Sequence, residues 1–147
     1  MKIKIRLAEE KDIKIIADIE SECFTTPESE SSVKDVIENP VYEAFVAESD
    51  GEVVGHTITM TSCGDTDILS VAVRPSFRRF GIGKMLMDNI IVTADKKGVT
   101  DVFLEVRKSN IPAISLYEKT GFEKIGERRN LCLTTGGLSV KINSAVG

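Results

Sequence analysis

A glycine-rich, basic segment is the part of the chain best suited to binding chemistry. Gly81 and Gly83 are separated by one residue, and four cations lie around them: Arg74, Arg78, Arg79 and Lys84. The segment follows an apolar strand that Pro75 ends, and it precedes an amphipathic helix that begins near Ile82. Glycines let the backbone approach a ligand closely, and the first turn of a helix leaves amide N–H groups without partners. The pattern therefore predicts a cradle for an anion, above all a phosphate group.

The same segment also fits an ordinary strand-to-helix turn with solvated arginines, because a short Gly-x-Gly is weak evidence by itself. It lacks the Gly-Lys-Ser/Thr of a nucleotide P-loop, and Leu86 stands where the dinucleotide pattern requires its third glycine. Arg78-x-x-Gly81-x-Gly83 does match the Arg/Gln-x-x-Gly-x-Gly/Ala motif, so the chain resembles the GNAT acetyltransferases. The resemblance implies that the loop amides hold the pyrophosphate of acetyl-coenzyme A.

The resemblance is densest from about Leu69 to Asn130, where the chain is similar to RimI-type ribosomal-protein alanine N-acetyltransferases. It implies Glu105 as the general base and Tyr117 as the general acid. It also implies coenzyme A contacts from the strand end, the loop and two later positions: Val71, Ala72, Val73, Arg78, Arg79, Phe80, Gly81, Ile82, Gly83, Lys84, Asn110 and Tyr117.

Two departures from the RimI-type pattern fall on the expected acceptor side. Leu131 and Cys132 stand where two tyrosines are usual, and Glu28 follows Pro27 in place of an aromatic residue. The resemblance therefore supports the transfer chemistry more closely than it defines the acceptor.

The residues around Glu105 also point to a base. The segment 103–106 reads as a strand flanked by crossovers, which is typically covered on both faces. Burial of a carboxylate is costly unless it is paired, and burial raises its pKa. The alternative is a strand-end glutamate near solvent, with Arg107 as its partner.

Tyr117 suits the role of an acid. An unperturbed phenol titrates near ~10 and a thiol near ~8.5, so a neutral tyrosine can protonate a departing thiolate. Tyr117 also shares a helix face with Ala113 and Leu116, so the alternative is a core aromatic residue. We expect a main-chain amide near Val73 to stabilise the oxyanion, and we interpret His56 as structural.

Composition narrows the class of protein. A chain of 147 residues is expected to form a single domain, 1–147, and its formal net charge of −4 argues against nucleic-acid binding. Three cysteines and one histidine lack metal-ligand spacing, so no metal site is expected. Unpaired thiols fit a reducing cytosol, and the N-terminus reads at once as a strand. We therefore expect a cytoplasmic protein with no signal peptide and no membrane association.

Hydrophobic periodicity predicts the order strand, two helices, three strands, helix, strand, helix and two strands. The expected strands are 2–7, 42–48, 52–61, 67–73, 101–106, 122–128 and part of 131–142, and the longer helices are 8–23, 82–97 and 111–120. A short helix capped by Ser31 or Ser32 ends at Asn39, and Asp50-Gly51 marks a hairpin. Leu69, Val71 and Val73 alternate with the smaller Ser70 and Ala72, as in a strand.

These elements predict an α/β (mixed α+β) fold, with a mixed central sheet of about six to seven strands and helices on both faces. A helical crossover joins strands 67–73 and 101–106, which should therefore be parallel, and ligands of such sheets bind beyond the carboxyl ends. The resemblance implies that these fourth and fifth strands splay around the cofactor.

The leading prediction is an enzyme that transfers acetyl from acetyl-coenzyme A to a protein N-terminal α-amine, directly within a ternary complex. The acceptor would be a ribosomal protein, and the enzyme a monomer or homodimer. One alternative is the same chemistry on a small amine or a lysine side chain, whose higher pKa asks more of the base. A second alternative is a non-catalytic coenzyme A-binding regulatory domain.

Overall fold

The structure is a computed structural model that describes residues 2–62, 64–106, 111–119, 121–126 and 138–143. Its strands form one mixed sheet in the order β1-β2-β3-β4-β5-β7-β6. Their bounds are β1 (Ile3–Leu7), β2 (Tyr42–Ser49), β3 (Glu52–Ser62), β4 (Asp65–Val73), β5 (Asp101–Val106), β6 (Glu123–Gly126) and β7 (Leu138–Asn143). The seven strands agree with the predicted number.

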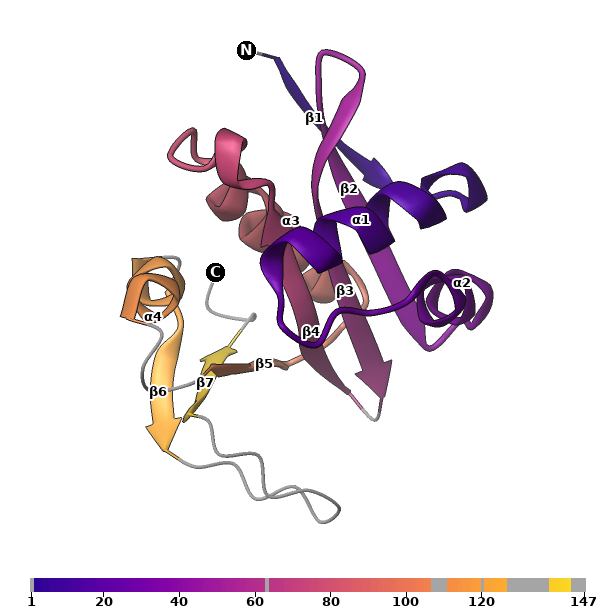
Figure 1. The fold of residues 1–147 in the computed structure, drawn as a ribbon. Coiled ribbons are helices and arrows are strands. Elements are labelled where there is room, and N and C mark those ends of the chain that lie inside the picture. Colours follow the sequence, from indigo (N-terminus) through magenta and orange to yellow (C-terminus); the bar gives the residue numbers. More distant parts are fainter. Residues whose placement is uncertain (1, 63, 107–110, 120, 127–137, 144–147) are drawn as a thin grey trace.

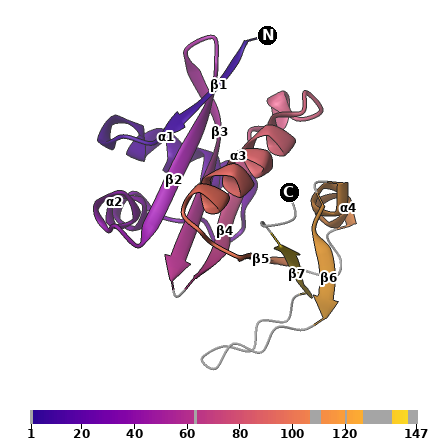
Figure 2. The same ribbon diagram turned by 180° about the vertical axis from the view of Figure 1, so that it is seen from behind.

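Helices cover both faces of the sheet, as predicted. On one face lie α1 (Ile13–Cys23) and α2 (Glu30–Glu38), in front of β2, β3 and β4 in Figure 1. On the other face lies α3 (Ile82–Lys96), which is in front of the sheet in the rear view of Figure 2. Helix α4 (Ile111–Lys119) lies farther along, near β6. Apart from two short 3-10 turns, Glu10–Asp12 and Pro75–Phe77, the order of elements is the predicted one. Within the described part of the chain, no helix is long and apolar enough to cross a bilayer.

Each helical layer packs its own apolar core against the sheet. On the α1 side the core is formed by Ile16, Ala17, Ile19, Val33, Val46, Val53 and Ala72. On the α3 side its largest cluster is formed by Ile68, Met87, Ile90, Ala94, Val99, Val102, Leu104 and Phe122. Strand β4 contributes to both, so its side chains must alternate between the two layers.

Turn and cap chemistry explains where elements begin and end. Asp50 and Gly51 have φ angles of 51° and 88°, the left-handed pair that a tight hairpin between β2 and β3 requires. The cap of α2 is Ser29, whose Oγ accepts the Ser32 N–H at 3.1 Å. The predicted cap at Ser31 or Ser32 was therefore wrong, because the helix begins two or three residues earlier.

Strand β4 has two irregularities that shape its neighbourhood. Its pairing with β3 shifts between Ile58 and Thr59, which leaves Leu69 as an extra residue in a β-bulge. Its parallel pairing with β5 runs only from Asp65↔Asp101 to Ile68↔Leu104. Beyond that point the two strands continue without recorded pairing, so the prediction of parallel strands that separate is confirmed.

Candidate active site

The loop after β4 has the backbone of an anion cradle. Arg79 and Gly81 adopt left-handed φ angles of 73° and 80°. Gly81 is the N-cap residue of α3 and has no side chain to cap the helix, and its carbonyl accepts the Met85 N–H at 3.1 Å. The amides of residues 82–84 therefore precede the helical ladder and remain available to a ligand. An ideal Cβ on Gly81 would meet no atom within 4 Å, so the approach is open.

Three of the four basic side chains of this loop already contact other groups of the protein. Arg78 donates from Nε to the Val73 carbonyl at 3.1 Å and so fastens the loop to the end of β4. Arg74 lies near the carboxylates of Glu22 and Glu52, at 3.3 and 3.7 Å. Lys84 pairs with Asp88 at 2.8 Å, and no ion pair of Arg79 is recorded among the described residues. Backbone amides and Arg79 are thus the readiest donors to an anion.

Cys23 touches the same loop from the end of α1. Its Sγ donates to the Val73 carbonyl at 3.5 Å, and Nη2 of Arg78 donates to Sγ at 3.6 Å. Burial raises the pKa of the Cys23 thiol, so the thiolate is disfavoured. A thiol held in its neutral form is a poor nucleophile, so Cys23 is not suited to covalent catalysis.

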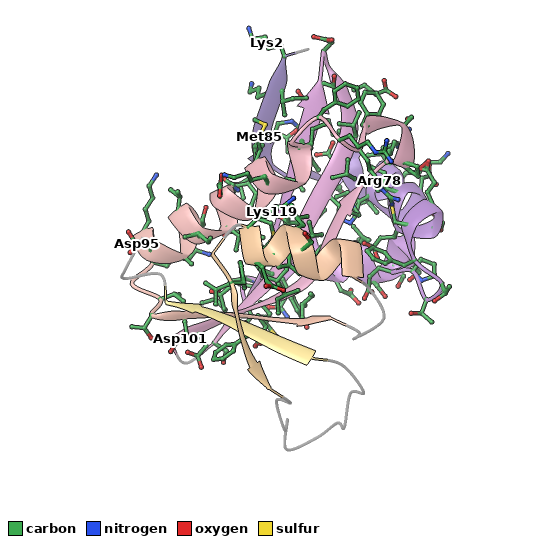
Figure 3. The ribbon with its side chains drawn as sticks, turned by 90° about the vertical axis from the view of Figure 1, so that its left-hand side faces the viewer. Lys2, Arg78, Met85, Asp95, Asp101 and Lys119 are labelled. Carbon is green, nitrogen blue, oxygen red and sulfur yellow. The ribbon has the colours of Figure 1, made fainter. Side chains whose placement is uncertain are left out.

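Helix α4 contacts the first turn of α3 through Leu116, the residue before Tyr117. A Cβ on Gly83 would lie 3.3 Å from Cδ2 of Leu116, so the two helices are in close contact there; Figure 3 shows them side by side. Tyr117 packs against the α3-side core, as Val71 of β4 does, and its ring centroid lies 6.2 Å from that of Phe122. Burial raises the pKa of its phenol, which therefore stays protonated at neutral pH.

Two predicted site residues are defined less fully. Glu105 lies in β5 immediately after the last residue paired with β4, opposite Ser139 of β7. Its backbone is therefore at the mouth of the separation between β4 and β5, and its side chain lies outside the description. Asn110 and Arg107 lie outside the described residues altogether.

A pocket of about 400 Å³ adjoins β4 on the α1 side, opposite the face that packs on α3. Its walls come from α1, the following loop, α2, β2, β3 and the bulge of β4: Glu20, Phe24, Thr26, Glu28, Ser32, Asp35, Val36, Tyr42, Ile58, Leu69 and Ser70. Three of these described lining residues are carboxylates, and none is a lysine, arginine or histidine. The pocket is thus suited to a cationic or amine-bearing ligand.

A buried polar cluster forms the inner wall of this pocket. Oε2 of Glu20 lies 2.7 Å from Nε2 of His56 and accepts the Ser70 hydroxyl at 2.5 Å. Burial by itself would raise the pKa of Glu20, but the hydrogen bonds from His56 and Ser70 outweigh it and hold the pKa below its usual range. Since an ionised carboxylate can only accept hydrogen bonds, Nε2 of His56 is the donor to Glu20. His56 is fully buried, which agrees with the structural interpretation.

The sequence reasoning missed Glu20, although a signal was present. Glu20 shares the apolar face of α1 with Ile16 and Ile19, where a charged residue is out of place. Only the tertiary structure places Ser70 and the Glu28 amide on the same carboxylate. Among the described residues, no group of three or more His, Cys, Asp or Glu side chains is arranged to hold a metal ion.

Comparison with known proteins identifies the family to which the chain belongs. The ribosomal protein bS18-alanine N-acetyltransferase of Escherichia coli (strain K12) is 36% identical over 96 residues, which are 65% of this chain and 65% of that enzyme. The putative enzyme of the same name from Bacillus subtilis (strain 168) is 31% identical over 136 residues, 92% of this chain and 90% of that protein. The crystal structure of the E. coli ribosomal-protein-S18-alanine N-acetyltransferase superimposes with a TM-score of 0.83 at 29% identity, covering 97% of this chain and 94% of that one. The Acetyltransferase (GNAT) family description matches residues 13–122, and the chain therefore belongs to the GNAT acetyltransferase family.

Proposed function

We propose that this protein is an N-acetyltransferase that transfers an acetyl group from acetyl-coenzyme A to the N-terminal α-amine of a protein. The observation that carries the proposal is the arrangement around β4. An open amide loop follows its carboxyl end, and an acidic pocket lies against its bulge. Membership of the acetyltransferase family and the relatives named above support both the donor and the kind of acceptor.

The residues at the loop fit the pyrophosphate of acetyl-coenzyme A. The uncapped first turn of α3 offers amides to the anion. Arg79 and Gly81, with their left-handed backbone, bend the loop immediately before these amides. Arg79 adds a positive charge. When bound, acetyl-coenzyme A supplies the thioester carbonyl carbon that an amine attacks. We propose that its pantetheine arm would lie along residues 71–73, which follow the last β4 residue paired with β5.

The chemistry then asks three things of the chain. The attacking amine forms the N–C bond as the C–S bond breaks, and its proton must pass to a base, for which Glu105 is proposed. The departing sulfur must gain a proton, and the Oη of Tyr117 holds one because burial raises its pKa. The developing oxyanion needs a donor, for which a free main-chain amide of β4 near Val73 is proposed.

The pocket on the α1 side is the proposed acceptor site. An α-amine titrates near ~8, so part of it is neutral in the cell and a modest base suffices. The cationic remainder is attracted by the exposed carboxylates of Glu28 and Asp35. We propose a ribosomal protein N-terminus as the acceptor, with the protein acting in the cytoplasm as a single domain.

The experiment that tests this proposal follows thiol release from acetyl-coenzyme A with the purified protein. N-terminal peptides beginning with alanine, free polyamines and peptides with only a lysine amine are compared as acceptors. Transfer to the N-terminal peptides, with the acetyl group located on the α-amine by mass spectrometry, is the expected result. Release with polyamines or lysine alone assigns the acceptor to a different amine, and binding of acetyl-coenzyme A without release identifies a regulatory domain. Mass spectrometry of N-termini from cells with and without the protein then names the target.

A further inference from the structure

The Glu20 carboxylate joins four segments of the chain at the inner wall of the pocket. It belongs to α1, and it accepts hydrogen bonds from His56 of β3 and Ser70 of β4. Its other oxygen, Oε1, accepts the backbone N–H of Glu28 at 3.2 Å, from the loop between α1 and α2. Glu20, Ser70 and Glu28 all line the pocket, so two of its three hydrogen bonds end at other pocket walls.

Such a group calls for an explanation beyond stability. Glu20 is only 2% exposed, and no lysine or arginine pairs with it among the described residues. A buried ionised carboxylate is costly even when hydrogen-bonded, and an apolar residue at this position would extend the stripe formed by Ile16 and Ile19. The core of this layer therefore does not require it.

The position of Ser70 links the cluster to the transfer reaction. Ser70 directly follows Leu69, the bulged residue of β4, and the parallel pairing of β4 with β5 ends one residue earlier, at Ile68. The side chain of Leu69 is 53% exposed and forms part of the pocket wall. The bulge is thus the point where the pocket meets the separating strands.

From these contacts we propose that Glu20 is a positioning residue for acetyl transfer, an inference that rests on the proposed function. Through Ser70 it holds the bulge of β4, and through the Glu28 amide it holds the loop that forms the opposite wall. These contacts keep the two walls at a fixed separation. The acceptor amine is thereby directed toward β4, along which the thioester arm of acetyl-coenzyme A is proposed to lie. Glu20 acts through these neighbours and touches no reacting atom.

The test is the Glu20→Gln variant, which keeps the size of the side chain and removes its charge. We expect kcat/KM for an alanine N-terminal peptide to fall roughly ten- to a hundredfold, because small errors of position are costly in transfer reactions. The Kd for acetyl-coenzyme A, measured by calorimetry, should stay at the wild-type value. Asp18→Asn is the matched control, since Asp18 is exposed on the same helix and should leave both values unchanged.

A second pair of variants keeps the proposal falsifiable if Glu20→Gln fails to fold. Ser70→Ala removes the hydroxyl that Glu20 accepts, whereas Ser70→Thr retains it. We expect Ser70→Ala to lower kcat/KM for the peptide and Ser70→Thr to restore most of it, again with unchanged acetyl-coenzyme A affinity. In the double variant Glu20→Gln/Ser70→Ala the losses should be less than additive, because both remove one interaction.

Two outcomes overturn the inference. One is a folded Glu20→Gln variant with wild-type kcat/KM, and the other is a Ser70→Ala variant that transfers as well as Ser70→Thr. Parallel loss of peptide turnover and acetyl-coenzyme A affinity also overturns it, since that result indicates general disruption. Failure of the wild-type protein to acetylate any N-terminal peptide is distinct from these outcomes, because it refutes the proposed function itself.

Discussion

Gly55 is the residue whose substitution most directly tests the coupling between the sheet and the anion loop. It lies in β3 opposite Val73, the last residue of β4. An ideal Cβ on Gly55 would lie 2.8 Å from the carbonyl oxygen of Ala72 and 3.4 Å from Cδ1 of Leu86. The nearer atom is backbone of the adjacent strand, and α3 packs over the same spot. Relief of the clash therefore requires β3 and β4 to separate locally by roughly half an ångström.

The expected cost of Gly55→Ala is that of overpacking a close contact, about 1–3 kcal/mol. For a chain of this size the melting temperature should fall by roughly 3–10 °C, measured by circular dichroism. The strain should also reach the loop, because the Arg74 N–H donates to the Val54 carbonyl at 2.8 Å beside the clash. We expect the Kd for acetyl-coenzyme A to rise about tenfold by calorimetry.

A matched control separates lost stability from a displaced strand. Gly51→Ala places a side chain at φ +88° at the β2–β3 hairpin, where a Cβ would meet no atom within 4 Å. Its cost is backbone strain of about 1–2 kcal/mol. It should lower the melting temperature without weakening acetyl-coenzyme A binding. An unchanged melting temperature for Gly55→Ala would refute the clash, and a lowered one with wild-type affinity would refute the coupling.

Three further predictions concern the site itself. Glu105→Gln should lower kcat by roughly a hundredfold or more and alter its pH profile, while acetyl-coenzyme A affinity stays similar; survival of both turnover and pH dependence would place the base elsewhere. Tyr117→Phe should slow single-turnover transfer. Because burial raises the pKa of Tyr117, its stabilising effect is present below ~10 and lost as pH rises through the folded-state pKa, so urea unfolding of the Phe variant should depend less on alkaline pH. Gly81→Ala (φ +80°) should weaken acetyl-coenzyme A binding, whereas Gly98→Ala (φ +74°), equally strained at the far end of α3, should leave the measured Kd unchanged.

Features encoded by local residue patterns could be read from the sequence. Asp50-Gly51 marks a hairpin because both residues tolerate left-handed backbone, and Gly98 at φ +74° ends α3 for the same reason. The loop around Gly81 is equally local, because a strand, a left-handed turn and an uncapped helix follow one another within a dozen residues. The half of the site proposed for the cofactor was therefore predictable from its own segment.

The half proposed for the acceptor was not predictable in this way, because its parts are distant in sequence. Glu20 meets Ser70 and His56 only through the packing of α1 on β3 and β4. The alternation of Leu69, Val71 and Val73 predicts one shared face, yet Leu69 is half exposed and lines the pocket. A bulge is set by pairing with the neighbouring strand, and β4 alone carries no sign of it.

The bulge explains how one strand can serve two sites on opposite faces. Ile68 and Val71 border the same core on the α3 side, although residues three apart in a regular strand face opposite ways. Because Leu69 is the extra residue of the bulge, Ile68 and Val71 both face α3. If the same sequence formed a regular strand with no bulge, a β4 that kept Val71 toward α3 would turn Ile68 toward α1, and one that kept Ile68 in place would turn Ser70 away from Glu20. Only the bulged strand packs Ile68 and Val71 against the same core and still presents Ser70 to Glu20.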